Sequence, residues 1–217
     1  PLSDCIEIEG EYYFFGNANM ESDNNTPYTI VVGANSESDY SSSYSTPGSN
    51  LWISAPGGEF GLDTRGAAII APDLMGCSRG FSSEMSPNKL KDEDPGCKYT
   101  EFMNGTSSAA PIVSGVIALI LEKNKNLAFR DVKDILARSA RKIDSSLSGN
   151  LLRNSKYNHW VTNAAGISFN NFYGFGAVDV KRALELVDEK THHLPPMIES
   201  GFLSSTDGDK RIPDNTP

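Results

Sequence analysis

The sequence has no apolar run long enough to cross a membrane and no excess of positive charge. Its longest apolar run, residues 109–121, is interrupted by Ser114 and is shorter than the roughly 20 residues that a bilayer-spanning helix needs. Acidic residues outnumber Lys and Arg by 28 to 19, and the net charge is −9. Because an acidic chain repels phosphate groups, we expect neither a nucleic-acid partner nor a membrane.

Cysteine is scarce, and the number of cysteines is odd. The three cysteines are Cys5, Cys77 and Cys97, and an odd count predicts one disulfide bond plus a cysteine whose partner lies elsewhere. Cys77 and Cys97 flank a polar segment without hydrophobic periodicity, where a disulfide would contribute about 3 kcal/mol. The sequence therefore predicts a Cys77–Cys97 bond and no assigned partner for Cys5. Three unrelated thiols are the alternative.

The size and composition fit a globular domain followed by a tail. The chain has 217 residues, of which 38% are hydrophobic and 22% charged. It opens with neither Met nor a signal-peptide pattern, so Pro1 predicts a processed product or a fragment. From residue 191 the composition becomes polar and Pro-rich, which predicts a linker.

Short strands alternate with helices in the expected secondary structure. A continuous run of β-branched residues predicts a strand that is buried on both faces at residues 28–34, and a second buried strand is predicted at residues 51–55, before the turn residues 56–58. An apolar run predicts a helix over residues 109–121, and helical spacing predicts one that starts at residue 127 and one over about residues 179–190. Weaker patterns predict short strands at 12–15 and 68–71, and residues 99–103 are expected to return to the core ahead of the apolar helix. This alternation is typical of the α/β class. Two convincing buried strands are too few for a self-sufficient sheet, so we expect a missing partner half.

A polar turn precedes the most apolar helix and carries the candidate chemistry. Asn104, Gly105, Thr106 and Ser107 form this turn, and the helix after it is apolar on all sides, which predicts burial on every wide face. The start of a helix offers unpaired N–H groups and partial positive charge. A serine there can act as a nucleophile whose own N–H stabilises an oxyanion. Alternatively, Thr106 or Ser107 only caps the helix.

Four blocks, in chain order, resemble the subtilisin-like serine proteases. Residues 104–111, Asn-Gly-Thr-Ser-Ser-Ala-Ala-Pro, are similar to the family's nucleophile motif Gly-Thr-Ser-x-Ala-x-Pro. The other blocks are residues 28–34, residues 44–49 with 55–57, and residues 173–179. Residues 126–133 and 212–215 resemble the kexin-like group, many of whose members carry a P domain after the catalytic domain.

The resemblance implies a fold and a domain organisation. It implies an α/β chain that forms the C-terminal portion of a subtilisin-like, parallel-sheet, three-layer domain and is incomplete at the N-terminus. On this interpretation residues 1–190 belong to the catalytic domain, 191–210 form a linker, and 211–217 begin a P domain. A secreted, periplasmic or cell-surface location and polypeptide substrates follow from the same resemblance.

The resemblance also implies a Ser–His–Asp triad with Ser107 as the nucleophile. Asn104, Gly105 and Thr106 would then contact the substrate. The family's His and Asp precede the Ser, whereas His159, His192 and His193 all follow it and are interpreted as solvated or packing residues. Asp63 lies in an Asp-Thr-Arg-Gly segment that comes too late in the chain to be the triad Asp. We therefore expect both partners upstream and the isolated chain to be inactive.

Substrate contacts and metal sites are less defined. Asn17 is the only local candidate for the oxyanion Asn, with an upstream residue as the favoured alternative. Glu21 and Asp23 lie near an expected substrate-pocket acid but are also explained as solvated loop acids, and Thr46 replaces another such acid. Specificity therefore stays open. The chemistry needs no cofactor, and structural calcium is compatible with this acidic chain, although no Asp-rich loop assigns its ligands.

Two other functions stay open at this point. A non-catalytic relative could keep the fold as a binding module without the triad. An α/β-hydrolase esterase would place its His after the Ser, so His159 could serve, but Ala109 stands where the Gly-x-Ser-x-Gly motif has its last Gly.

Overall fold

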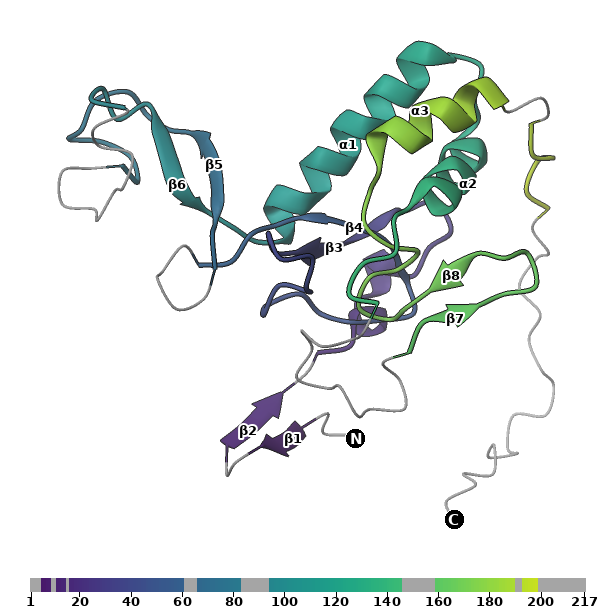
Figure 1. Ribbon diagram of the computed structural model, residues 1–217, viewed down its shortest axis with the longest axis horizontal. Coiled ribbons are helices and arrows are strands. Elements are labelled where there is room, and N and C mark those ends of the chain that lie inside the picture. The colour runs from purple at the N-terminus through teal and green to yellow at the C-terminus, as the bar shows by residue number, and fades with distance from the viewer. Residues whose placement is uncertain are drawn as a thin grey trace.

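The centre of the fold is a pair of parallel strands. The computed structural model describes residues 16–60, 66–82, 94–145, 159–189 and 193–198, and the backbone of the antiparallel strands β1 (Cys5–Ile8) and β2 (Glu11–Phe14) (Figure 1). Strand β3 (Val31–Asn35) pairs in parallel with β4 (Leu51–Pro56). Both strands were predicted, β3 from its β-branched run and β4 from the short apolar run before Pro56, and Ala34, Ile53 and Ala55 are fully buried.

Three helices cover this pair of strands on the same side (Figure 1). They are α1 (Thr106–Lys123), α2 (Phe129–Ser139) and α3 (Val180–Glu189). The buried stripe of α2 contains Val132, Ile135 and Leu136, as its helical spacing predicts. Asp179 caps α3, because its carboxylate accepts the amide of Arg182 at 2.9 Å. Side chains of the three helices and of the two parallel strands pack together in one hydrophobic core, and the chain is α/β as expected.

Helix α1 corrects one expectation. Its buried residues lie on one face only, and Ile112 and Leu119 are 36% and 44% exposed. The prediction of burial on every side was therefore wrong for the described chain, because only β3, β4 and α3 pack closely on this helix. Within the described residues, α1 is also the one helix long and apolar enough to cross a membrane, a test that core helices of soluble proteins pass as well.

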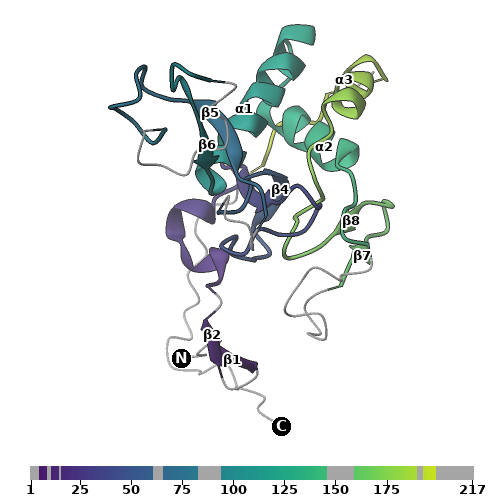
Figure 2. The same ribbon diagram turned by 60° about the vertical axis from the view of Figure 1, so that its left-hand side comes forward.

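A two-stranded arm projects beside the start of α1 (Figures 1 and 2). Strands β5 (Ile69–Pro72) and β6 (Tyr99–Met103) pair antiparallel and form it. The predicted Cys77–Cys97 disulfide closes the arm, with the two Cα atoms 5.0 Å apart. Thr100 is the only buried residue of β6, so this strand borders the core rather than entering it.

Short elements complete the description. Two 3₁₀ helices, η1 (Ala18–Met20) and η2 (Ser22–Asn24), precede β3, and the hairpin of β7 (Val161–Thr162) and β8 (Ser168–Phe169) lies beyond α2. Asp63, His192, the side chain of Cys5 and residues 199–217, which include most of the expected linker and the expected P-domain start, lie outside the described residues.

Candidate active site

The turn before α1 adopts a backbone that favours glycine. Gly105 has φ 108° and ψ 166° and stands at the N-cap position of α1. Thr106 and Ser107 are the first two helical residues, and both are exposed. Ser108, the next residue, is buried in the core. The structure therefore presents the Ser107 side chain to solvent at the very start of the helix.

Hydrogen bonds fix this turn to the end of β4. The Gly105 amide donates to the carbonyl of Gly57 at 3.1 Å and to the hydroxyl of Tyr44 at 2.8 Å. The Tyr44 hydroxyl lies 2.7 Å from the carbonyl oxygens of both Gly57 and Gly58, to which it can donate. The Asn104 side chain donates to the carbonyl of Glu59 at 3.0 Å. The turn is thus held at Asn104 and Gly105 by residues 57–59 and by Tyr44.

Close packing leaves no room for a side chain at Gly57. A Cβ atom there would lie 2.5 Å from the Ala34 Cβ and 3.1 Å from the Gly105 carbonyl oxygen. Strand β3, the end of β4 and the turn before α1 therefore meet at this glycine. Three of the four blocks that carried the family resemblance come together at one point in space.

The fourth block supports β4 from its other edge. Residues 173–178 run beside β4, where the Ser54 amide donates to Gly176 and the Val178 amide donates to Ser54, each at 2.8 Å. Tyr173 is fully buried, and its hydroxyl donates to the Asp144 carboxylate at 2.9 Å. Burial raises the pKa of Tyr173 above its ordinary value. This block stabilises the strand that holds the turn.

The start of α1 can stabilise negative charge. The amides of Ser108 and Ala109 donate to the Gly105 carbonyl, at 2.9 and 3.4 Å. The amides of Thr106 and Ser107 precede them at the positive end of the helix dipole. An oxyanion formed beside Ser107 would meet these N–H groups. The arrangement suits nucleophilic attack by Ser107 on a carbonyl carbon.

The structure brings neither described histidine to Ser107. The Nδ1 atom of His193 lies 2.9 Å from the carboxylate of Asp131, which is fully buried at the start of α2. Helix α1 is about 27 Å long, and α2 begins beyond its far end, so this pair is remote from Ser107 (Figure 1). His159 is exposed and immediately precedes Trp160 and β7, which lies apart from the start of α1 in both ribbon views.

The remaining candidates lie on the surface around η1 and β3. Asn17 is exposed, and its side chain accepts the Asn19 amide at 3.0 Å as the cap of η1. Glu21, Asp23 and Thr46 are exposed. Among the described residues there is no group of three or more His, Cys, Asp or Glu side chains that could hold a metal ion. The expected structural calcium therefore has no assigned ligands in this part of the chain.

Sequence reasoning missed two contacts, one at the turn before α1 and one at the start of α2. The role of Tyr44 at Gly105 was hidden, because a hydrogen bond between residues 61 positions apart leaves no periodic signal. The Asp131–His193 pair was missed because each residue looked ordinary in its own segment. The only available signal for Asp131 was its N3 position in α2, where its carboxylate accepts the Ala128 amide at 3.0 Å.

Known proteins share both the sequence and the fold. The model of the Subtilase family, peptidase S8, matches residues 14–176. The Aeromonas extracellular serine protease of Aeromonas sobria is 38% identical over 200 residues, which cover 85% of this chain and 32% of that protein. Neuroendocrine convertase 2 of Drosophila melanogaster is 33% identical over 138 residues, 59% of this chain and 20% of that protein. The chain spans a third or less of these relatives.

The solved structures agree with this assignment. The crystal structure of the Aeromonas sobria serine protease in complex with a chaperone superposes with a TM-score of 0.74 at 38% identity, over 84% of this chain and 32% of that one. Because the family model matches most of the chain and the fold agrees, this chain belongs to the subtilase family and has an α/β, subtilisin-like fold.

Proposed function

We propose that this chain is the C-terminal part of the catalytic domain of a serine endopeptidase, with Ser107 as its nucleophile. The observation that carries the proposal is the exposed Ser107 at the positive start of α1, on a turn fixed by Gly57 and Tyr44. Membership in a family of serine proteases supports the same reaction class.

The proposed reaction proceeds by covalent catalysis. The Oγ of Ser107 attacks the carbonyl carbon of the scissile peptide bond while a histidine takes its proton. The Ser107 N–H stabilises the oxyanion of the tetrahedral intermediate. The histidine then protonates the leaving amine, and water hydrolyses the acyl-enzyme. Asn104, Gly105 and Thr106 would contact the substrate backbone beside the bond that breaks.

The proposed His and Asp come from sequence upstream of residue 1, and so does the oxyanion Asn. His193 pairs with Asp131 far from Ser107. His159 immediately precedes β7, which lies apart from the start of α1. We therefore do not propose either histidine as the base. On this proposal the 217-residue chain alone is inactive and marginally stable. An upstream segment would also cover the exposed face of α1, where Ile112 and Leu119 lie.

We also propose the group of enzymes within the family, the domain organisation and the location of the protein. A kexin-like enzyme, with residues 191–210 as linker and 211–217 as the start of a P domain, fits the short matches in the sequence and the similarity to neuroendocrine convertase 2. Secretion fits the Cys77–Cys97 disulfide and the extracellular Aeromonas relative. Polypeptide substrates fit the protease relatives. Structural calcium is retained as a proposal without ligands.

The test compares Ser107→Ala with wild type in the intact protein, with whatever sequence adjoins these residues, on casein. We expect hydrolysis to fall by roughly a thousandfold or more, because removing the nucleophile disables a triad that works as a unit. Ser114→Ala is the matched control, since Ser114 is exposed on the same helix and its hydroxyl donates only to the Ala110 carbonyl. Equal hydrolysis by wild type and Ser107→Ala would refute the proposal.

A non-catalytic subtilase relative is the second candidate function. It would keep the fold and the turn before α1, and it predicts no casein hydrolysis by the intact wild-type protein. The α/β-hydrolase esterase is disfavoured, because the chain is a subtilase.

A further inference from the structure

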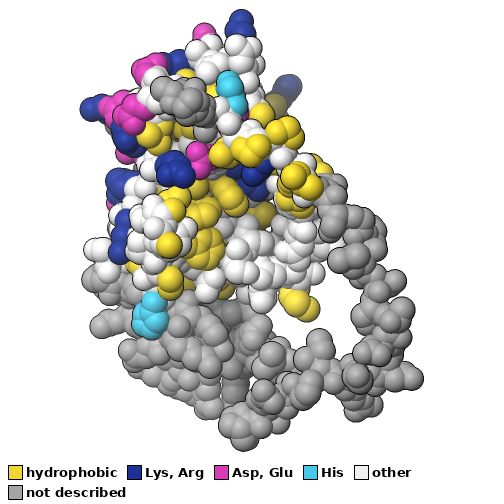
Figure 3. Space-filling view, turned by 90° about the vertical axis from the view of Figure 1, so that its right-hand side faces the viewer, with side chains coloured by type: hydrophobic (Ala, Val, Ile, Leu, Met, Phe, Trp, Pro, Cys, Tyr) yellow, Lys and Arg dark blue, Asp and Glu magenta, His cyan; other side chains and the backbone are white. Residues whose placement is uncertain are grey.

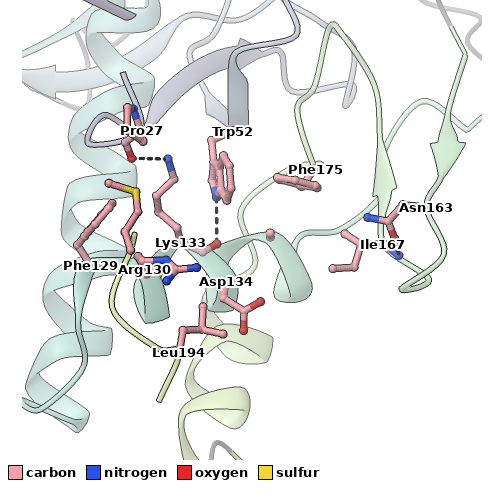
Figure 4. A pocket seen from close by; sticks show the side chains of 12 residues that line it. Pro27, Trp52, Phe129, Arg130, Lys133, Asp134, Asn163, Ile167, Phe175 and Leu194 are labelled. Atoms are coloured by element: carbon pink, nitrogen blue, oxygen red, sulfur yellow. Dashed lines mark hydrogen bonds between the residues drawn. The ribbon is translucent and has the colours of Figure 1, made fainter. Parts of the chain in front are cut away.

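A cleft of about 390 Å³ lies between α2, the β7–β8 hairpin and residues 193–198 (Figures 3 and 4). Figure 3 shows hydrophobic side chains gathered on this face, with Lys and Arg side chains among and around them. The cleft has the size of a small-molecule site and a largely apolar lining. Its main apolar residues are Trp52, Phe129, Ile167, Phe175, Leu194 and Met197.

The aromatic floor of the cleft is held in place. The rings of Trp52 and Phe175 meet edge to face, with centroids 4.9 Å apart. The indole N–H of Trp52 donates to the Lys133 carbonyl of α2 at 3.0 Å. Because both the ring contact and the indole nitrogen are satisfied, the floor needs no rearrangement to receive a ligand.

The outer wall is held to α2 by a buried carboxylate. Asp131 accepts the Leu194 amide at 2.8 Å and lies 2.9 Å from Nδ1 of His193. Arg130 donates to the Pro195 carbonyl. Residues 193–198 therefore lie along the start of α2, and Leu194 and Met197 face the cleft.

Two cations in the cleft have no carboxylate partner among the described residues. The Lys133 ammonium donates to the carbonyls of Pro27 and Thr29, at 3.1 and 3.0 Å, and lies 4.0 Å from the Trp52 ring centroid. Burial lowers the pKa of Lys133. Arg130 uses one of its five N–H donors on a carbonyl. The nearby acid, Asp134, pairs with Arg138 at 2.8 Å.

We propose that this cleft binds a small aliphatic carboxylate, with its chain on Trp52 and Phe175 and its carboxylate at Arg130 and Lys133. Figure 4 shows Arg130 near the middle of the lining, between Trp52 above and Leu194 below, and the Lys133 ammonium beside Trp52 and next to Pro27. An apolar cleft whose two cations lack a carboxylate partner among the described residues favours an apolar anion over a neutral or cationic ligand. The cleft contains no residue of the 104–108 turn, so the site is independent of the proposed protease chemistry.

The test uses isothermal titration calorimetry of the intact protein with octanoate, octanol and octylammonium. We expect one octanoate to bind per chain, at least tenfold more tightly than octanol, and octylammonium to bind most weakly. Arg130→Met and Lys133→Met keep the apolar stems and remove the charges, so each should weaken octanoate at least fivefold and leave octanol unchanged. Lys125→Met is the matched control, because Lys125 is exposed and lies outside the cleft.

A substitution in the outer wall, residues 193–198, tests the site without replacing Arg130 or Lys133. Leu194→Glu would place a carboxylate at the cleft, and it should abolish octanoate binding while a far-ultraviolet spectrum stays native. Equal affinity for octanoate and octanol would overturn the proposal. So would an unchanged octanoate affinity in the Arg130→Met/Lys133→Met double variant, or no binding of octanoate at millimolar concentration.

Discussion

The hydroxyl oxygen of Tyr44 lies 2.8 Å from the amide nitrogen of Gly105, and it joins two segments that are 61 residues apart. The same oxygen lies 2.7 Å from the Gly57 carbonyl. This phenol is therefore one of the anchors of the turn that carries Ser107. The placement of the proposed nucleophile thus depends in part on a side chain from a distant segment of the chain.

Tyr44→Phe tests this dependence. The change removes only the hydroxyl, so the fold should persist while the Gly105 turn loses one of its anchors. We expect kcat/KM of the intact protein on a peptide substrate to fall by roughly tenfold, since a small misplacement of a reacting group is costly. Tyr28→Phe, at a 60% exposed tyrosine, should leave the rate unchanged. An equal rate for Tyr44→Phe and wild type would mean that the phenol does not position the turn.

Gly57→Ala tests the packing at the meeting point of the three blocks. The new methyl group would lie 2.5 Å from the Ala34 Cβ and close to the Gly105 carbonyl, so either β3 or the turn must move. We expect a loss of about 1–3 kcal/mol in the free energy of unfolding, together with reduced hydrolysis. Denaturant unfolding and a peptide assay measure both.

The matched control for this change is Gly115→Ala in α1, where an added Cβ meets nothing within 4 Å. Alanine favours a helix over glycine by about 0.5–1 kcal/mol, so this variant should be as stable as wild type or more so. If Gly57→Ala were as stable and as active as Gly115→Ala, the close packing at Gly57 would matter neither for stability nor for hydrolysis.

From the buried Tyr173 we predict that the free energy of unfolding falls at alkaline pH. Burial raises the pKa of Tyr173 in the folded state, whereas an exposed tyrosine in the unfolded chain has a pKa of about 10. The unfolded state therefore loses its proton first, and the stabilisation that is present below about pH 10 is lost as the pH rises further. Denaturant unfolding between pH 8 and 11 should show this decline. Tyr173→Phe should flatten it, although the variant is less stable at pH 8 because Asp144 loses its donor. A decline of equal slope in both proteins would exclude Tyr173 as the cause.

The Cys77–Cys97 disulfide predicts a local effect of reduction. The bond closes a sequence separation of 20 residues, and loop closure of this size contributes on the order of 3 kcal/mol. A Cys77→Ser/Cys97→Ser variant should expose the arm of β5 and β6 to limited proteolysis before the helices are cut. Simultaneous cleavage of the arm and of α2 would show instead that the bond stabilises the whole domain.

The parts of the fold that were predicted are those with local patterns. Strand β3 was predicted from a β-branched run and β4 from a short run ended by Pro56. Helix α2 was predicted from the spacing of its apolar residues, and the cap of α3 from Asp179. The exposed face of α1 was not predicted, because apolar composition does not tell how many neighbours a helix has. The sequence pattern of an apolar helix predicts burial, whether or not all the elements that pack against the helix belong to the same chain segment.

The candidate site was predicted as a motif but not as a geometry. The residues around Ser107 indicated a nucleophile, and the structure adds that Gly57 and Tyr44 hold the turn. The Asp131–His193 pair shows the limit of residue-by-residue interpretation. Its geometry is that of a carboxylate orienting an imidazole, yet it secures residues 193–198 on α2 and lies far from Ser107.

The most direct measurement of the central claim is covalent labelling of the intact protein with a fluorophosphonate, followed by mass spectrometry of its peptides. We expect one adduct on Ser107, lost in Ser107→Ala and retained in Ser114→Ala. An intact wild-type protein that forms no adduct, or an adduct that persists in Ser107→Ala, would contradict the account.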